Sequence, residues 1–180
     1  AIFEKAIAQG REYDAEIQAI LARGGRDPLA VYEAVAVADI RQAADLLAAV
    51  YRRTHTQDGY VSLEVSPELA HDAPGTLAEA RRLWQEVDRP NLMIKVPGTR
   101  TCLPVIRTLL AEGINVNITL LFAKEAYSLV AEAYLAALEE RLGKGMPVDR
   151  VASVASFFIS RIDTLVDKRL DARASAAAPT

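Results

Sequence analysis

Residues 91–99, NLMIKVPGT, form a short apolar run that contains one lysine and ends in a Pro-Gly turn. Leu92, Ile94 and Val96 recur at every second position, which is the period of a β-strand. Lys95 lies between them and therefore points to the other side of the strand, near its C-terminal end. A lysine in a buried strand costs free energy unless it is paired or used, and a desolvated amine attacks carbonyl groups more readily. A catalytic amine, a paired structural lysine and an anion-binding cation all remain open.

The composition describes an ordinary globular protein. Of the 180 residues, 51% are hydrophobic and 25% are charged, and the formal net charge is −3. We expect one domain with a sizeable core and, without a run of Lys and Arg, no nucleic-acid partner. No apolar segment approaches the ~20 residues of a membrane span, so we expect no membrane partner and a cytoplasmic location.

Cysteine and histidine usage argues against a metal site. Cys102 is the single cysteine, and neither His55 nor His71 has a second histidine or cysteine at ligand spacing. An internal disulfide is therefore excluded, and we predict no bound metal. Cys102 is interpreted as the start of a helix without a functional role, and the two histidines as loop residues.

Helices and strands are expected to alternate along the chain. Strands are predicted at residues 60–65, around Lys95, at 114–121 and at 151–159, and helices at 2–23, 28–37, 39–53, 76–87, 101–112, 124–142 and 163–170. This alternation is typical of parallel βα units. We expect a single domain over residues 1–170, followed by a disordered alanine-rich tail at 171–180.

Local signals define three of the helix starts. Asp27 is expected to cap a helix that has Pro28 at its first position. Asp39 is expected to cap a separate helix, and Thr76 with Glu79 has the spacing of a capping box.

Three of the four strands are aliphatic on one side and polar on the other. In the strand at 114–121, the alternating sets are Ile114, Val116, Ile118 and Leu120 against Asn115, Asn117 and Thr119. An open doubly wound sheet needs apolar residues on both sides of its central strands, whereas a closed barrel turns a polar side toward its mouth. We therefore favour an α/β fold of the (βα)8 barrel type over a sheet with one exposed side. Because this barrel needs eight strands, about four strands make a partial barrel, either half of one that associates or a portion of a longer protein.

The predicted interior set suits carbonyl chemistry on a phosphorylated sugar. It consists of Glu64, Lys95, Asn115, Asn117, Thr119 and Ser156, followed by Arg161. Lysine supplies an amine for a Schiff base and glutamate moves protons, while serine and arginine suit a phosphate. Singly, each has another interpretation: Glu64 and Lys95 as an ion pair, Ser156 as packing, and Arg161 as a helix cap.

Four segments, in this order and spacing, resemble the signature segments of transaldolases. They are DGYVSLEVSPELAHD at 58–72, NLMIKVPGT at 91–99, GINVNITLLF at 113–122 and VASFFISRID at 154–163. The resemblance covers nearly all of residues 1–170. It is closest to the bacterial branch that includes fusions with glucose-6-phosphate isomerase.

The resemblance implies an enzyme of the pentose phosphate pathway that needs no cofactor. It would transfer a dihydroxyacetone unit from a ketose phosphate (fructose 6-phosphate or sedoheptulose 7-phosphate) to an aldose phosphate. The implied roles are Lys95 as the Schiff-base lysine, Glu64 as a proton relay through a water, Thr119 as the residue that positions this water, Asn117 as a ligand of the dihydroxyacetone moiety, and Ser156 and Arg161 as phosphate ligands. Sugar phosphates would be the partners, with a homo-oligomer or a fused isomerase domain in the parent protein as further expectations.

The sequence departs from the family at several points. Thr101-Cys102 replaces an acidic or small residue followed by glycine, and Ala123 replaces a capping serine. The family's catalytic aspartate would precede Ala1, so the chain as given is expected to lack part of the proton-transfer machinery. The alternatives are a fructose-6-phosphate aldolase, which a tyrosine in place of Glu64 would favour, and a non-catalytic sugar-phosphate-binding remnant, which loss of Lys95 or Glu64 would favour.

Overall fold

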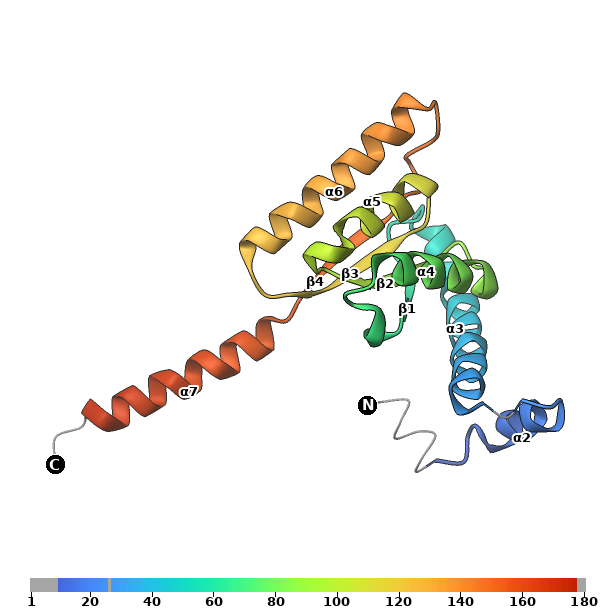
Figure 1. Ribbon diagram of the computed structural model, residues 1–180, viewed down its shortest axis with the longest axis horizontal. Coiled ribbons are helices and arrows are strands. Elements are labelled where there is room, and N and C mark those ends of the chain that lie inside the picture. The colour runs from blue at the N-terminus through green and yellow to red at the C-terminus, as the bar shows by residue number, and fades with distance from the viewer. Residues whose placement is uncertain (1–9, 26, 178–180) are drawn as a thin grey trace. The chain divides into compact units, whose positions relative to one another are not determined.

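The structure, a computed structural model, describes residues 10–25 and 27–177, with side chains described through Ala174. Its elements in chain order (Figure 1) are α2 (Asp14–Ala22), α3 (Pro28–Arg53), β1 (Val61–Glu64), η1 (Pro67–Leu69), α4 (Ala73–Val87), β2 (Leu92–Pro97), η2 (Arg100–Cys102), α5 (Leu103–Glu112), β3 (Val116–Leu121), α6 (Lys124–Gly143), β4 (Ser153–Phe157) and α7 (Ile159–Ala177). The chain divides into two compact units, Ala1–Leu63 with Leu83–Leu92 and Glu64–Arg82 with Met93–Thr180. The expectation of a single domain over residues 1–170 stays a prediction.

Helix α3 dominates the first unit and corrects the prediction of two helices at 28–37 and 39–53. As predicted, the Asp27 carboxylate caps its start by accepting from the amides of Leu29 and Ala30. Asp39 caps nothing: it lies inside the helix, and its carboxylate accepts from the Tyr13 hydroxyl at 2.6 Å. The helix continues through this position because, after Pro28 at its start, neither Gly nor Pro occurs in α3. The same hydrogen bond to Asp39 raises the pKa of Tyr13 to about 12.

Of the N-terminal helix predicted at 2–23, the described residues 10–13 are not helical. Helix α2 covers Asp14–Ala22, and the first part of the prediction, residues 2–9, lies outside the described residues. Within the same unit, the buried Asn91 amide donates to the carbonyls of Ala44 and Gly59, both at 2.9 Å. This side chain ties the segment before β2 to α3.

The sheet follows the chain order, β1-β2-β3-β4. In the second unit, β2 pairs in parallel with β3, and β3 pairs in parallel with β4. Ile94, Val96, Val116 and Ile118 of the aliphatic side are at most 2% exposed, and α5 and α6 pack together on the sheet (Figure 1). Four sequential parallel strands with their helices confirm the α/β fold class and match part of a (βα)8 barrel.

Helices α5 and α6 follow their sequence signals. Gly113 ends α5 with a φ of 89°, as predicted, a conformation that glycine adopts without strain. Ala123 starts α6 without a side-chain cap. The buried Arg141 guanidinium of α6 donates to the carbonyls of Ala111 and Pro147, both at 2.9 Å, and so satisfies the end of α5.

Leu120 lies on the wrong side of β3 for the predicted alternation. The pairing of β3 with β4 shifts between Ile118 and Leu121, and Leu120 has a φ of 62°. As a result, Leu120 is 43% exposed and Leu121 is fully buried. The extra residue of this β-bulge reverses the alternation at the carboxyl end of the strand.

The capping box predicted at Thr76 and Glu79 is wrong. Helix α4 begins at Ala73, and the Asp72 carboxylate accepts from the Gly75 amide at 3.0 Å. Thr76 therefore lies inside the helix, where its buried hydroxyl donates to the Leu69 carbonyl at 2.7 Å. Glu79 accepts from the Ser66 amide at 2.8 Å. Both side chains fasten the segment that follows β1.

Helix α7 differs from the predicted helix at 163–170 and the predicted tail at 171–180. It begins at Ile159 and continues to Ala177, because alanine has the highest helix propensity. Residues 178–180 of the predicted tail lie outside the described residues. Over the described helices, none combines the length and apolar character needed to cross a bilayer.

Thr76→Val should lower the free energy of unfolding by about 1–2 kcal/mol, because it removes the donor to the Leu69 carbonyl. The control is Thr108→Val, whose hydroxyl donates to the Pro104 carbonyl at 2.8 Å on the more exposed side of α5; it should change the same quantity by less than about 0.5 kcal/mol. Urea unfolding followed by circular dichroism measures both. Equal losses in the two variants would contradict the role assigned to Thr76.

Candidate active site

Lys95 and Glu64 meet on the polar side of the sheet. Lys95 lies in β2 between Ile94 and Val96, which are fully buried on the other side. Its Nζ donates to Glu64 Oε2 at 3.0 Å, and the two side chains are 27% and 48% exposed. An ion pair in contact with water adds little to stability. Separating the pair therefore costs little, and the amine can leave Glu64 to react.

Asn117 lies beside Lys95. The register of β2 and β3 pairs these two residues directly, so both side chains project from the same side of neighbouring strands, whose backbones lie about 4.8 Å apart. Ser156 of β4 donates its hydroxyl to Asn117 Oδ1 at 2.8 Å. This bond fixes the orientation of the Asn117 amide. The polar side thus presents a carboxylate, an amine, an amide and a hydroxyl from four strands.

Thr119 and Asn115 continue the polar side of β3 in opposite directions from Asn117. Thr119 is paired with Pro97, two residues beyond Lys95, and is 1% exposed. Asn115 is 2% exposed, and its Oδ1 accepts from the Ala152 amide at 2.9 Å. Asn115, included in the predicted interior set, therefore joins β3 to β4 in the core.

The turn after β2 approaches β3 closely at Gly98. The Gly98 amide donates to the Thr119 carbonyl at 2.7 Å. A Cβ at this position would lie 2.7 Å from Leu121 Cδ2 and 3.1 Å from that same carbonyl oxygen. Only glycine fits here without a shift of its neighbours.

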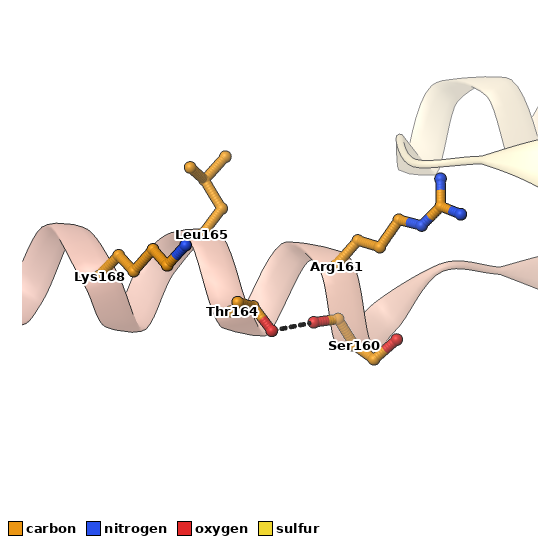
Figure 2. Close-up of a pocket in the computed structure, with 5 residues that line it drawn as sticks. All are labelled: Ser160, Arg161, Thr164, Leu165 and Lys168. Carbon is orange, nitrogen blue, oxygen red and sulfur yellow. Dashed lines mark hydrogen bonds between the residues drawn. The ribbon is translucent and has the colours of Figure 1, made fainter.

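Arg161 lies apart from the contacts made by Lys95, on the first turn of α7. Its guanidinium carbon is 4.5 Å from the centre of the Phe158 ring. Arg161 is one of five residues of α7 that line a pocket, the others being Ser160, Thr164, Leu165 and Lys168; Figure 2 shows these five side chains along the helix. The two residues predicted to bind phosphate thus have different neighbours, Ser156 contacting Asn117 and Arg161 contacting Phe158.

Two aromatic residues near the site were missed by sequence reasoning. Phe122 and Phe158 follow β3 and β4, and their rings stack with centroids 5.3 Å apart. The signal was available, because both residues end strands whose carboxyl ends share one edge of the sheet.

Comparison with known proteins identifies the family. The family described as Transaldolase/Fructose-6-phosphate aldolase matches residues 1–179. The chain is 50% identical over 173 residues to Transaldolase 2 of Nostoc sp., covering 96% of this chain and 45% of the relative. It is 54% identical over 164 residues to Transaldolase 2 of Nostoc punctiforme (91% and 43%), and 51% identical over 170 residues to the transaldolase of Saccharopolyspora erythraea (94% and 46%).

The chain therefore belongs to the Transaldolase/Fructose-6-phosphate aldolase family, which confirms the resemblance of its four segments. It spans a little under half the length of these curated relatives.

Gly98→Ala should lower the free energy of unfolding by about 1–3 kcal/mol, because the new methyl group overlaps Leu121 and the Thr119 carbonyl. The matched control is Gly143→Ala at the end of α6, where a Cβ meets nothing within 4 Å; it should be neutral or stabilise by up to about 1 kcal/mol. Urea unfolding gives both values. A tolerated alanine at position 98 would contradict the close approach of this turn to β3.

Proposed function

We propose that this chain carries the lysine centre of a transaldolase, which transfers a dihydroxyacetone unit from a ketose phosphate to an aldose phosphate. The observation that carries the proposal is the 3.0 Å contact of Lys95 Nζ with Glu64 Oε2 on the polar side of the sheet, beside Asn117. The names of the relatives support a transferase in preference to a lyase. Such substrates would make the reaction a step of the pentose phosphate pathway in the cytoplasm.

Lys95 would act as the nucleophile. Its unprotonated amine adds to the C2 carbonyl of the ketose phosphate, and loss of water gives an iminium ion. The C4 hydroxyl then gives its proton, through a water, to the Glu64 carboxylate while the electron pair of the C3–C4 bond flows into the iminium. The aldose phosphate leaves as an aldehyde, and the three-carbon unit remains on the lysine as an enamine. Addition of the enamine to an acceptor aldehyde, followed by hydrolysis, completes the transfer and restores the amine.

Glu64 would move the protons of these steps. Its carboxylate accepts the proton that the amine gives up and returns a proton to the hydroxyl that leaves C2 as water. Its exposure of 48% leaves room for a water between the carboxylate and the substrate. Thr119, on the same side of β3, is proposed to position that water.

Asn117, Ser156 and Arg161 would hold the substrate. The Asn117 amide, oriented by Ser156, suits a hydroxyl of the three-carbon unit. Ser156 and Arg161 are proposed as phosphate ligands. Because a serine hydroxyl has one proton, Ser156 would turn that proton from Asn117 Oδ1 to the phosphate when a substrate binds. The Arg161 guanidinium lies over the Phe158 ring, with its carbon 4.5 Å from the ring centre, and a guanidinium can bind two phosphate oxygens at once.

Lys95→Arg should abolish labelling by fructose 6-phosphate and borohydride, because a permanently charged guanidinium forms no Schiff base. Labelling at position 95 is measured by peptide mass mapping. The matched control is Lys144→Arg, since Lys144 also contacts a glutamate, Glu140, at 2.8 Å; it should be labelled like the wild type. Equal labelling of Lys95→Arg and wild type would rule out the proposed nucleophile.

Products distinguish transfer from lysis. With erythrose 4-phosphate as acceptor, the proposal predicts transfer of the three-carbon unit and little free dihydroxyacetone. Release of free dihydroxyacetone at the same rate with and without an acceptor would instead indicate an aldolase.

A further inference from the structure

The segment after Glu64, residues 65–72, is fastened by side chains from other parts of the second unit. The Ser66 amide donates to Glu79 at 2.8 Å, and the Leu69 carbonyl accepts from Thr76 at 2.7 Å. The Ala70 carbonyl accepts from Thr99 Oγ1 at 3.0 Å. Glu79 and Thr76 belong to α4, which follows this segment directly. Thr99 comes from the turn after β2, four residues beyond Lys95.

The Thr99 bond therefore joins the turn that follows Lys95 to the segment that follows Glu64. At the two strands themselves, the Val65 amide donates to the Lys95 carbonyl at 3.2 Å. Beyond Lys95, the backbone turns toward β3, where Gly98 donates to Thr119. Contact with residues 65–72 is then made by side chains: Thr99 Oγ1, and Cys102 Sγ at 3.6 Å from the Ala70 carbonyl.

The direction of the Thr99 hydroxyl is fixed. Its oxygen accepts from the Cys102 amide at 3.3 Å as the cap of η2, and its proton goes to Ala70. Thr99 is half-buried, so these bonds compete less with water than they would on an open surface.

The attraction between Glu64 and Lys95 is too weak by itself to fix the distance between Glu64 Oε2 and Lys95 Nζ. Both side chains are partly exposed, and an ion pair in water contributes too little to hold two flexible side chains in one geometry. The separation of carboxylate and amine is therefore set by the backbones that carry them. A proton relay tolerates little displacement, since a shift of about 1 Å can cost a factor of about 100 in rate.

We propose that Thr99 is a positioning residue for this pair: its hydrogen bond to Ala70 holds the segments after Glu64 and Lys95 together and so keeps Glu64 Oε2 in contact with Lys95 Nζ. The catalytic meaning of this contact rests on the proposed function. The contact itself does not, and it can be measured without a sugar.

Zero-length cross-linking with a water-soluble carbodiimide measures the contact directly. The reagent activates a carboxylate, and an amine within bonding distance displaces it to form an amide, which peptide mass mapping detects. In the wild-type chain we expect a Glu64–Lys95 amide. Thr99→Val, which keeps the shape but removes the hydroxyl, should lower its yield about tenfold, the factor that corresponds to one net hydrogen bond.

Three controls separate positioning from a general loss of structure. Thr99→Ser retains the hydroxyl and should restore the yield to within about twofold of wild type, and Thr108→Val should leave it unchanged to within about twofold. The Glu140–Lys144 pair of α6, at 2.8 Å, supplies a second cross-link in the same sample; its yield should be equal in all variants. Loss of the circular dichroism signal in Thr99→Val would mean that the variant is unfolded. Thr99→Ala then repeats the test, because alanine removes the hydroxyl without placing a methyl group where the oxygen was.

The proposal is overturned if Thr99→Val gives as much Glu64–Lys95 cross-link as the wild type. It is also overturned if Thr99→Ser loses as much of this cross-link as Thr99→Val. Labelling by fructose 6-phosphate and borohydride provides the separate test of function. Absence of a sugar adduct on wild-type Lys95 contradicts the proposed function alone, whereas unchanged cross-linking in Thr99→Val contradicts the role of Thr99 alone.

Discussion

The alternation of β2, with aliphatic residues on one side and Lys95 on the other, is the constraint on which the rest of the second unit depends. Ile94 and Val96 are fully buried, so a shift of one residue in register would put the lysine in the core and the aliphatic residues in water. The free energy that such a register shift would cost keeps Lys95 paired with Asn117. Glu64 and Ser156 reach the same side through their contacts, since Lys95 Nζ donates to Glu64 Oε2 and the Ser156 hydroxyl donates to Asn117 Oδ1.

Strand pairing alone does not hold the site in place, because the loops that follow the strands need further hydrogen bonds. Backbone pairing reaches from Val65 to Lys95 and from Gly98 to Thr119. Beyond these points, backbone carbonyls and amides are bound by side-chain hydroxyl and carboxylate groups and no longer by a neighbouring strand. The polar residues of the second unit thus divide into two sets. Glu64, Lys95 and Asn117, on the polar side of the sheet, can reach a substrate, and Thr76 and Thr99, at the loops, hold the backbone that carries this first set.

The sequence predicted what depends on burial, together with the Asp27 cap, and missed other features that depend on a particular hydrogen bond. The period of two in β2 and β3 places Lys95 and Asn117 on the correct side of the sheet, because one side of each strand is buried in the core and the other is not. The helix boundary at Asp39 and the capping box at Thr76 were wrong, because Asp and Thr bind backbone or side-chain partners inside helices as well as at their starts. The bulge at Leu120 depends on strand pairing, which no local pattern reports.

The central claim is that the polar side of this sheet is the surface on which a ketose phosphate reacts. A crystal structure of the wild-type chain, reduced with borohydride in the presence of fructose 6-phosphate, tests it most directly. The claim predicts electron density continuous with Lys95 Nζ, with the three-carbon end of the sugar beside Asn117 and Glu64. Density attached to another lysine, or a sugar lying away from this side of the sheet, would contradict it.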